Sequence, residues 1–297
     1  MPLSTGYIVA QTIDTLFYAS ILFLVASGLS LIYGIMRILN LAHGAFYMLG
    51  AYISYTVAML WLGPSPVSFV AGFALAALVL AALGAAIERG VIRPFYSKPS
   101  ELQLLITFAL MIIFDDVVKM IWGPEYKSFT SLPWGHIRVG SYTVPVYTLV
   151  VIVAGFATAV ALWWFFSKTT MGKQMRAAAY NSEIAAALGM NTDLLFVSAF
   201  ALGAALSGFA GAMASPILTA YPGMGTEAII LSFAVIVIGG MGSILGSLVG
   251  SLIVAVSRTI MIMVYPLLEI ALIYIVMVIV LLVKPVGLFG KEFVERK

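Results

Sequence analysis

Polar residues interrupt two long apolar runs near the start of the chain, in the stretch MRILNLAHGAFYMLGAY from Met36 to Tyr52. Asn40 is placed to cap a following helix by accepting the free N–H of His43 or Gly44. The N-terminus of such a helix carries partial positive charge, which favours a carboxylate group. At membrane depth, a broken helix of this kind needs a cover of protein or a water-filled cavity. The alternative is that Asn40 is an ordinary cap at the membrane interface.

A second glycine-rich break, GGMGSILGSLVG, lies late in the chain and begins at Gly239. In several transporters the ends of two broken helices hold the substrate near the middle of the bilayer. The two breaks therefore indicate a candidate path for a polar solute. Its candidate residues are Asn40, His43, Gly44, Tyr47, Gly239 and Gly240.

Glycines four residues apart, Gly242, Gly246 and Gly250, follow the second break. Gly203, Ser207 and Gly211 repeat this spacing, as do three alanines at 77, 81 and 85. Such faces let helix backbones approach closely in lipid. Close helix packing is one interpretation of these stripes, and lining of the path is the other.

Charged residues within the apolar runs are few and lie toward the ends of those runs. Asp115 and Lys119 are four residues apart and are expected to pair on one helix, whereas Asp116 is expected to point elsewhere. Arg258 and Glu269 flank a tight connection and are expected to pair across a hairpin. None of these is a central carboxylate of the kind that an ion-coupled transporter requires.

Residues for catalysis are missing from the sequence. The chain has no cysteine, and its two histidines, His43 and His136, lie far apart without a second metal-ligating residue nearby. We therefore expect no enzyme activity, no catalytic residue, no metal site and no cofactor held by this chain.

The composition indicates a membrane protein. Of the 297 residues, 63% are hydrophobic and only 9% are charged, with a mean hydropathy of +1.11. A soluble domain has roughly 45–50% apolar and about 25% charged residues. The composition therefore predicts an all-α, polytopic transmembrane helical bundle, with residues 1–297 forming a single transmembrane domain.

About eight or nine membrane spans, including short or broken helices, follow from the apolar runs, since a bilayer core needs roughly 20 helical residues. The run at 226–239 is too short to cross alone without tilt, so it crosses or is re-entrant. The predicted spans are residues 7–35, 41–62, 67–87, 102–122, 144–166, 194–218, 226–239, 244–265 and 267–283.

Basic residues lie mostly on one side of these spans, and cytoplasmic connections carry the excess of Lys and Arg. This places the C-terminus in the cytoplasm, and an odd number of spans would place the N-terminus outside. The basic residues on the cytoplasmic side are Arg37, Arg89, Arg93, Lys98, Lys168, Lys173, Arg176, Lys284, Lys291, Arg296 and Lys297.

The cytoplasmic segment at about 168–192 differs from the other connections because it predicts helices of its own. Thr169 or Thr170 can cap a helix that begins near Met171, Gly189 suits its C-terminal stop, and Asn191 offers a cap for the next span. One or two short helices with small apolar faces are expected here. They either rest on lipid headgroups or dock in a groove on a soluble partner.

Several stretches resemble branched-chain amino-acid ABC permeases of the LivH/LivM type, and LivH more closely. The similarity covers about residues 20–290 and includes GLSLIYGIMRILNLAHGAFYMLGAY, IERGVIRPFYSKP, VIVIGGMGSILGSLVGSLI and VLLVKPVGLFG. Residues 183–189, EIAAALG, are similar to the Glu-Ala-Ala, three residues, Gly motif of importer permeases, with Ile184 departing from the pattern.

This resemblance implies a transport subunit in a bacterial or archaeal cytoplasmic (inner) membrane. Its implied partners are a second permease chain, LivM-like or a second copy, a solute-binding protein, and two ATPase subunits that hold ATP and magnesium. It also implies branched-chain or related hydrophobic amino acids as solutes. The segment 171–189 would dock on the ATPases through Met171, Gly172, Lys173, Arg176, Glu183, Ala185, Ala186 and Gly189.

The chain has no Gly-rich phosphate loop of its own, so energy must come from a partner chain, an ion gradient or the gradient of the solute. The alternative function is therefore an ion-coupled secondary transporter, or a channel, for a small polar solute.

Overall fold

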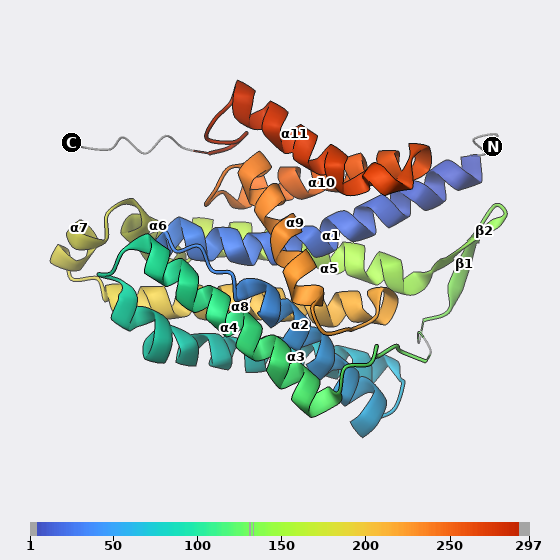
Figure 1. The fold of residues 1–297 in the computed structure, drawn as a ribbon, viewed down its shortest axis with the longest axis horizontal. Helices are drawn as coiled ribbons and strands as arrows, with labels where there is room; N and C mark the ends of the chain where they lie inside the picture. The colour runs from blue at the N-terminus through green and yellow to red at the C-terminus, as the bar shows by residue number, and fades with distance from the viewer. Residues whose placement is uncertain (1–4, 131, 133, 291–297) are drawn as a thin grey trace.

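The computed structural model describes residues 5–130, 132 and 134–290, and these form a bundle of helices with one small hairpin (Figure 1). The longer helices lie roughly along the long axis of the molecule in that view. The α-helices are α1 (Thr5–Met36), α2 (His43–Tyr55), α3 (Pro66–Ile87), α4 (Ser100–Trp122), α5 (Val146–Lys168), α6 (Thr170–Tyr180), α7 (Ser182–Ala187), α8 (Thr192–Leu218), α9 (Met224–Gly239), α10 (Ile244–Val264) and α11 (Glu269–Val283).

Two helices continue into other helical forms. A π-helical segment, Thr56–Trp61, extends α2, and a second one, Glu88–Ile92, extends α3 before a 3-10 turn at Arg93–Phe95. A further 3-10 turn, Pro266–Leu268, joins α10 to α11.

Each predicted span coincides with a helix to within two residues at either end, apart from the third, which continues to Phe95. Among the described residues, six helices are long and apolar enough to cross a membrane, and α9 is a shorter apolar helix. The all-α prediction holds except for the antiparallel hairpin of β1 (His136–Val139) and β2 (Tyr142–Pro145), which the sequence did not predict.

The two ends of the bundle carry different elements (Figure 1). The hairpin lies at the end where α1 begins, and α6 and α7 lie at the opposite end, toward which α11 runs. The ion pairs expected from the sequence fit this arrangement. Arg258 Nε lies 3.2 Å from Glu269 Oε1 across the α10–α11 connection, and Lys119 Nζ lies 2.5 Å from Asp115 Oδ2.

The expectation for Asp116 was wrong. Lys119 Nζ also lies 3.2 Å from Asp116 Oδ1, because residues three apart on a helix are neighbours just as residues four apart are.

The core forms where α8 packs against α1, α2 and α3, and glycines allow this approach. A Cβ atom added at Gly50 would overlap the carbonyl oxygen of Gly208, and one at Gly211 would overlap that of Tyr47. The stripe at Gly246 and Gly250 packs in the same way on α9. This is the backbone contact that small residues permit in lipid.

The face of α3 that carries the alanine stripe does not make the closest contact of this helix with α8. Positions 77, 81 and 85 are half-buried, whereas Ala76, Leu80 and Gly84, on a neighbouring face of the same helix, are buried. At Gly84 an added Cβ would meet the side chain of Ala204 on α8.

The short helix α9 lies in the middle of the bundle, inclined to its long axis, and different segments of the chain contact it near its two ends (Figure 1). Just before it, Ala220 pairs through its backbone with Lys127, which precedes the hairpin. Just after it, Gly242 lies against Gly34, near the end of α1. The carbonyl of Gly239 accepts a hydrogen bond from the N–H of Phe289, which follows α11.

Candidate functional site

The break between α1 and α2 lies inside the bundle. His43, the first residue of α2, is fully buried, and its Nε2 atom lies 2.9 Å from the carbonyl oxygen of Val25. Val25 precedes the end of α1 by eleven residues, which is about 16 Å along a helix. The chain therefore turns back into the protein before α2 starts, as a broken helix would.

Asn40 does not form the cap expected from the sequence. The cap position is Ala42, which has no side-chain capping hydrogen bond, and Asn40 lies two residues too early to reach the free N–H groups of α2. Only its backbone carbonyl takes part, by accepting the N–H of His43 at 3.3 Å. Within the described chain, both side-chain polar atoms of this fully buried residue lack a hydrogen-bond partner, and so does Nδ1 of His43.

The candidate path residues fall into two groups. Asn40, His43, Gly44 and Tyr47 lie around the start of α2, where Gly44 packs on Gly225 of α9. Gly239 and Gly240 lie at the other end of α9, fourteen residues or about 21 Å further along that helix. The structure therefore brings the first four together and separates them from the last two.

The segment 168–192 folds as its capping residues predict. Thr169 caps α6 by accepting the N–H of Gly172 at 3.0 Å, and Asn181 caps α7 by accepting that of Ile184 at 2.9 Å. Gly189 ends α7 with a φ of +82°, which is the left-handed conformation that glycine adopts most easily. Asn191 then caps α8 by accepting the N–H of Leu194.

Six of the eight residues that the resemblance implied for ATPase docking are exposed or half-buried. The other two, Gly172 and Ala185, are buried against this chain, and a Cβ at Gly172 would overlap the carbonyl of Phe165 on α5. The rest of the described chain therefore covers these two residues. Large apolar side chains that are exposed on this segment include Ile184 (59% exposed) and Leu188 (72%), and neither is among those eight residues.

A cluster of charged residues that the sequence analysis missed joins the end of α3 to the start of α8. Glu88 has a fully buried side chain and pairs with Arg93, with 3.3 Å between Oε2 and NH2. Arg93 NH1 also lies 3.1 Å from Asp193 Oδ2. Tyr96 donates a short hydrogen bond to Glu88, and burial together with this bond raises the pKa of the Tyr96 hydroxyl, which stays protonated. The only sequence signal was the density of ionisable residues in IERGVIRPFY.

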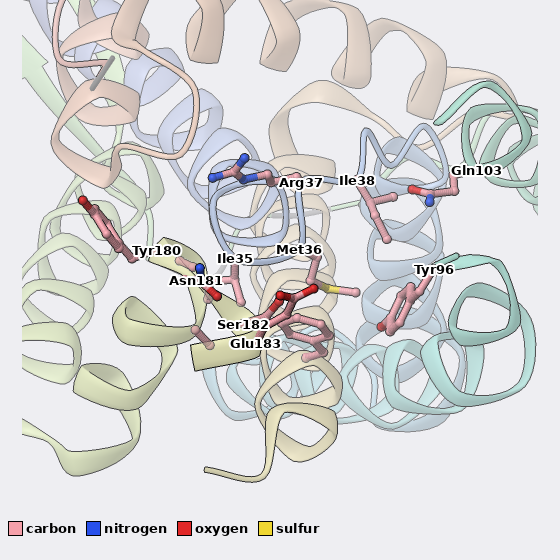
Figure 2. A pocket seen from close by; sticks show the side chains of 13 residues that line it. Ile35, Met36, Arg37, Ile38, Tyr96, Gln103, Tyr180, Asn181, Ser182 and Glu183 are labelled. Atoms are coloured by element: carbon pink, nitrogen blue, oxygen red, sulfur yellow. The ribbon is translucent and has the colours of Figure 1, made fainter. Parts of the chain in front are cut away.

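A cavity of about 540 Å³ lies between the junction of α6 and α7 and the end of α1 (Figure 2). One wall is the end of α1 with Arg37 and Ile38, and the facing wall is the junction of α6 and α7. Tyr96, Gln103 and Phe196 complete the lining, and the rings of Tyr96 and Phe196 meet edge to face with centroids 5.6 Å apart. The cavity therefore lies directly beside the charged cluster.

These features together define a multi-pass helical membrane permease. The model of the family described as branched-chain amino acid transport system / permease component matches residues 11–281. The chain belongs to this family and is the permease component of an ABC transport system, not itself an enzyme.

Curated relatives agree with this family. The chain is 30% identical to the high-affinity branched-chain amino acid transport system permease protein LivH of Salmonella typhimurium, with 98% of each chain covered. It is 28% identical to BraD of Pseudomonas aeruginosa, a protein described in the same words, with 96% of this chain and 97% of that chain covered.

Two weaker matches extend the comparison. The fructose import permease protein FrcC of Rhizobium meliloti is 25% identical, with 73% of this chain and 61% of that chain covered. Among solved structures, PsaBC from Streptococcus pneumoniae in complex with Fab aligns at 15% identity and a TM-score of 0.47, with 90% of this chain and 89% of that chain covered.

Proposed function

We propose that this chain is one of two permease halves of an importer in which separate ATPase subunits dock on the segment 168–192. The observation that carries the proposal is the exposed apolar pair Ile184 and Leu188, presented by a segment whose three helix starts are capped. Two apolar side chains four residues apart form an anchor of the kind that fits a groove on a partner. The segment 168–192 is called the coupling segment below.

The coupling segment is attached so that a push from an ATPase subunit would be transmitted to the membrane-spanning helices α5 and α8. It joins α5 at Lys168 and α8 at Thr192, and Gly172 packs directly on the last turn of α5. Movement of α6 and α7 would therefore carry both spans with it. The cavity behind the coupling segment leaves room for that movement (Figure 2).

The proposed orientation of the protein in the membrane follows the positive-inside rule. The end with the coupling segment is cytoplasmic, as is the C-terminus, and the N-terminus with the β1–β2 hairpin faces outward. A solute-binding protein would then meet the hairpin end. ATP and magnesium belong to the ATPase subunits, and the second permease is a LivM-like chain or another copy of this one. The membrane is a bacterial or archaeal cytoplasmic membrane, since relatives come from Salmonella and from the archaeon Methanocaldococcus jannaschii.

The proposed solutes are branched-chain or related hydrophobic amino acids. Support comes from LivH and BraD, which match nearly the whole chain, whereas the fructose permease matches less of it. The unpaired buried atoms of Asn40 and His43 offer hydrogen bonds to a polar group that passes the start of α2. An unsatisfied buried polar group is costly, and a passing solute group or water would relieve that cost.

The test uses the complete complex in proteoliposomes, with ATP hydrolysis, uptake and co-purification of the ATPases measured. Ile184→Asp with Leu188→Asp should release the ATPases and abolish uptake, because two charges would have to enter an apolar groove. Arg89→Asp is the control, since Arg89 is exposed on another connection at the same end and should leave assembly intact. Full assembly and uptake in the double variant would overturn the docking proposal.

A second experiment separates this function from an ion-coupled transporter. Vesicles that contain only this chain should not accumulate leucine under a proton or sodium gradient. Uphill accumulation by the chain alone would overturn the proposal of a separate motor.

A further inference from the structure

Glu88 has a carboxylate with no access to solvent, in the π-helical turn that ends α3. A buried charge is stable only when it is paired and hydrogen-bonded. Glu88 meets both conditions, because it accepts hydrogen bonds from Nε and NH2 of Arg93 and from the hydroxyl of Tyr96. π-helical turns within helices are frequent at functional sites.

Arg93 extends this network to a second structural element. Its NH1 group donates to the carboxylate of Asp193 at 3.1 Å, and its NH2 group donates to the backbone carbonyl of the same residue at 3.4 Å. Asp193 lies in the first turn of α8, two residues after the cap residue Asn191. One guanidinium therefore joins the connection between α3 and α4, residues 88–99, to the position where the coupling segment meets α8. This connection is called the α3–α4 elbow below.

A planar guanidinium is suited to this task because its fixed fork of donors can serve two acceptors at once with defined directions. The ring contact between Tyr96 and Phe196 joins the same elbow to the first turns of α8. The cavity lies directly beside this contact, since both Tyr96 and Phe196 line it.

We propose that Arg93 is a positioning residue of the transport cycle: α3 and α8 already pack along their lengths, and by joining Glu88 to Asp193 Arg93 fixes the α3–α4 elbow to the start of α8, so that motion of the coupling segment reaches the elbow and α4. The inference rests on the proposed function, because it assumes that the ATPases drive the coupling segment.

The quantity that tests this link is the amount of solute moved per ATP hydrolysed, measured in the assembled complex in proteoliposomes. Asp193→Lys places a like charge beside Arg93 while Glu88 stays paired, and Asp193 is exposed enough for the fold to tolerate the change. We expect the ratio to fall about threefold or more while assembly and ATP hydrolysis persist, which is the scale of coupling changes caused by distant mutations.

The matched control is Glu101→Lys. Glu101 is likewise an exposed acid in the first turn of a helix at the same end of the bundle, so the helix dipole loses the same favourable charge. Its ratio should equal that of the wild type. A wild-type ratio in Asp193→Lys, or equal losses in both variants, would overturn the proposal.

A rescue experiment uses the absence of cysteine from this chain. The triple variant Glu88→Gln with Arg93→Cys and Asp193→Cys, which leaves no unpaired buried charge, should have a low ratio before treatment in a complex whose partners lack cysteine. A short bifunctional thiol reagent that joins the two positions should then restore the ratio. Loss of uptake on cross-linking would instead mean that the contact must open during the cycle, which contradicts a rigid link.

These outcomes are distinguishable from failure of the proposed function. If the coupling segment is not the ATPase dock, Ile184→Asp with Leu188→Asp leaves the complex assembled and active. If only the Arg93 link is wrong, that double variant still releases the ATPases, while Asp193→Lys keeps a normal ratio.

Discussion

Gly44 and Gly225 lie back to back at the first turns of α2 and α9. A Cβ atom on either residue would overlap the carbonyl oxygen of the other. Two short helices, α2 with 13 residues and α9 with 16, thus meet through bare backbone near their N-termini, beside buried Asn40 and His43. Close packing of this kind fixes the position of both helix starts relative to one another.

Gly44→Ala and Gly225→Ala should each destabilise the permease by about 1–3 kcal/mol, because an extra methyl group would force the backbones apart. Thermal unfolding of the purified chain in detergent measures the change. Gly90→Ala is the control, since nothing lies within 4 Å of a Cβ added there. Equal midpoints for all three variants would contradict the close contact.

The sequence predicted the membrane spans well because lipid leaves the backbone few choices. A segment in the hydrocarbon core must satisfy its own hydrogen bonds, so a long apolar run becomes a helix whatever its neighbours are. The coupling segment was predictable for a local reason as well. Thr169 and Asn191 cap helices within three residues of themselves, and Gly189 stops one.

Features that depend on tertiary contacts were not predictable in the same way. Asn40 was expected to cap α2, but the position of the first turn is set by His43 packing into α1. Nothing in the sequence distinguishes Gly172 from an exposed glycine in a helix, yet it packs on α5. The network around Glu88 joins residues a hundred positions apart in sequence, and spacing alone could not reveal it.

Asn40→Leu should separate transport from stability. Both polar atoms of this buried side chain are unpaired in the described structure, so an apolar replacement of similar size should leave the unfolding midpoint unchanged or raise it. If Asn40 contacts the solute, uptake by the complex should fall about tenfold, which corresponds to the loss of one hydrogen bond to a charged group. Thr107→Val removes a hydroxyl that donates to the neighbouring carbonyl of Leu39, and it should change uptake little. Normal uptake by Asn40→Leu would remove this residue from the path.

Gly189→Ala should loosen the end of the coupling segment. The left-handed φ of +82° costs a non-glycine residue about 1–2 kcal/mol, and asparagine tolerates it better than alanine. Trypsin should therefore cut at Lys173 or Arg176 faster in Gly189→Ala than in Gly189→Asn. Gly63→Ala places the same strain at a φ of +72° in the connection between α2 and α3. It should leave cleavage of the coupling segment unchanged, and equal rates in all variants would show that Gly189 does not hold the segment.

Arg258 and Glu269 should stabilise the docking of α11, in which Ile273 is the one buried residue. Arg258 also lies over the ring of Tyr18 on α1, 4.2 Å from its centroid, so one side chain ties α11 to α10 and to α1. A double-mutant cycle with Arg258→Met and Glu269→Gln, followed by thermal unfolding in detergent, should give a coupling energy of about 1 kcal/mol. The same cycle on Lys127 and Glu125, a 4.0 Å pair whose carboxylate is 85% exposed, should give no measurable coupling. Equal coupling in the two cycles would mean that the Arg258 pair adds nothing beyond an ordinary surface contact, and the apolar contacts of α11 would then have to hold it in place.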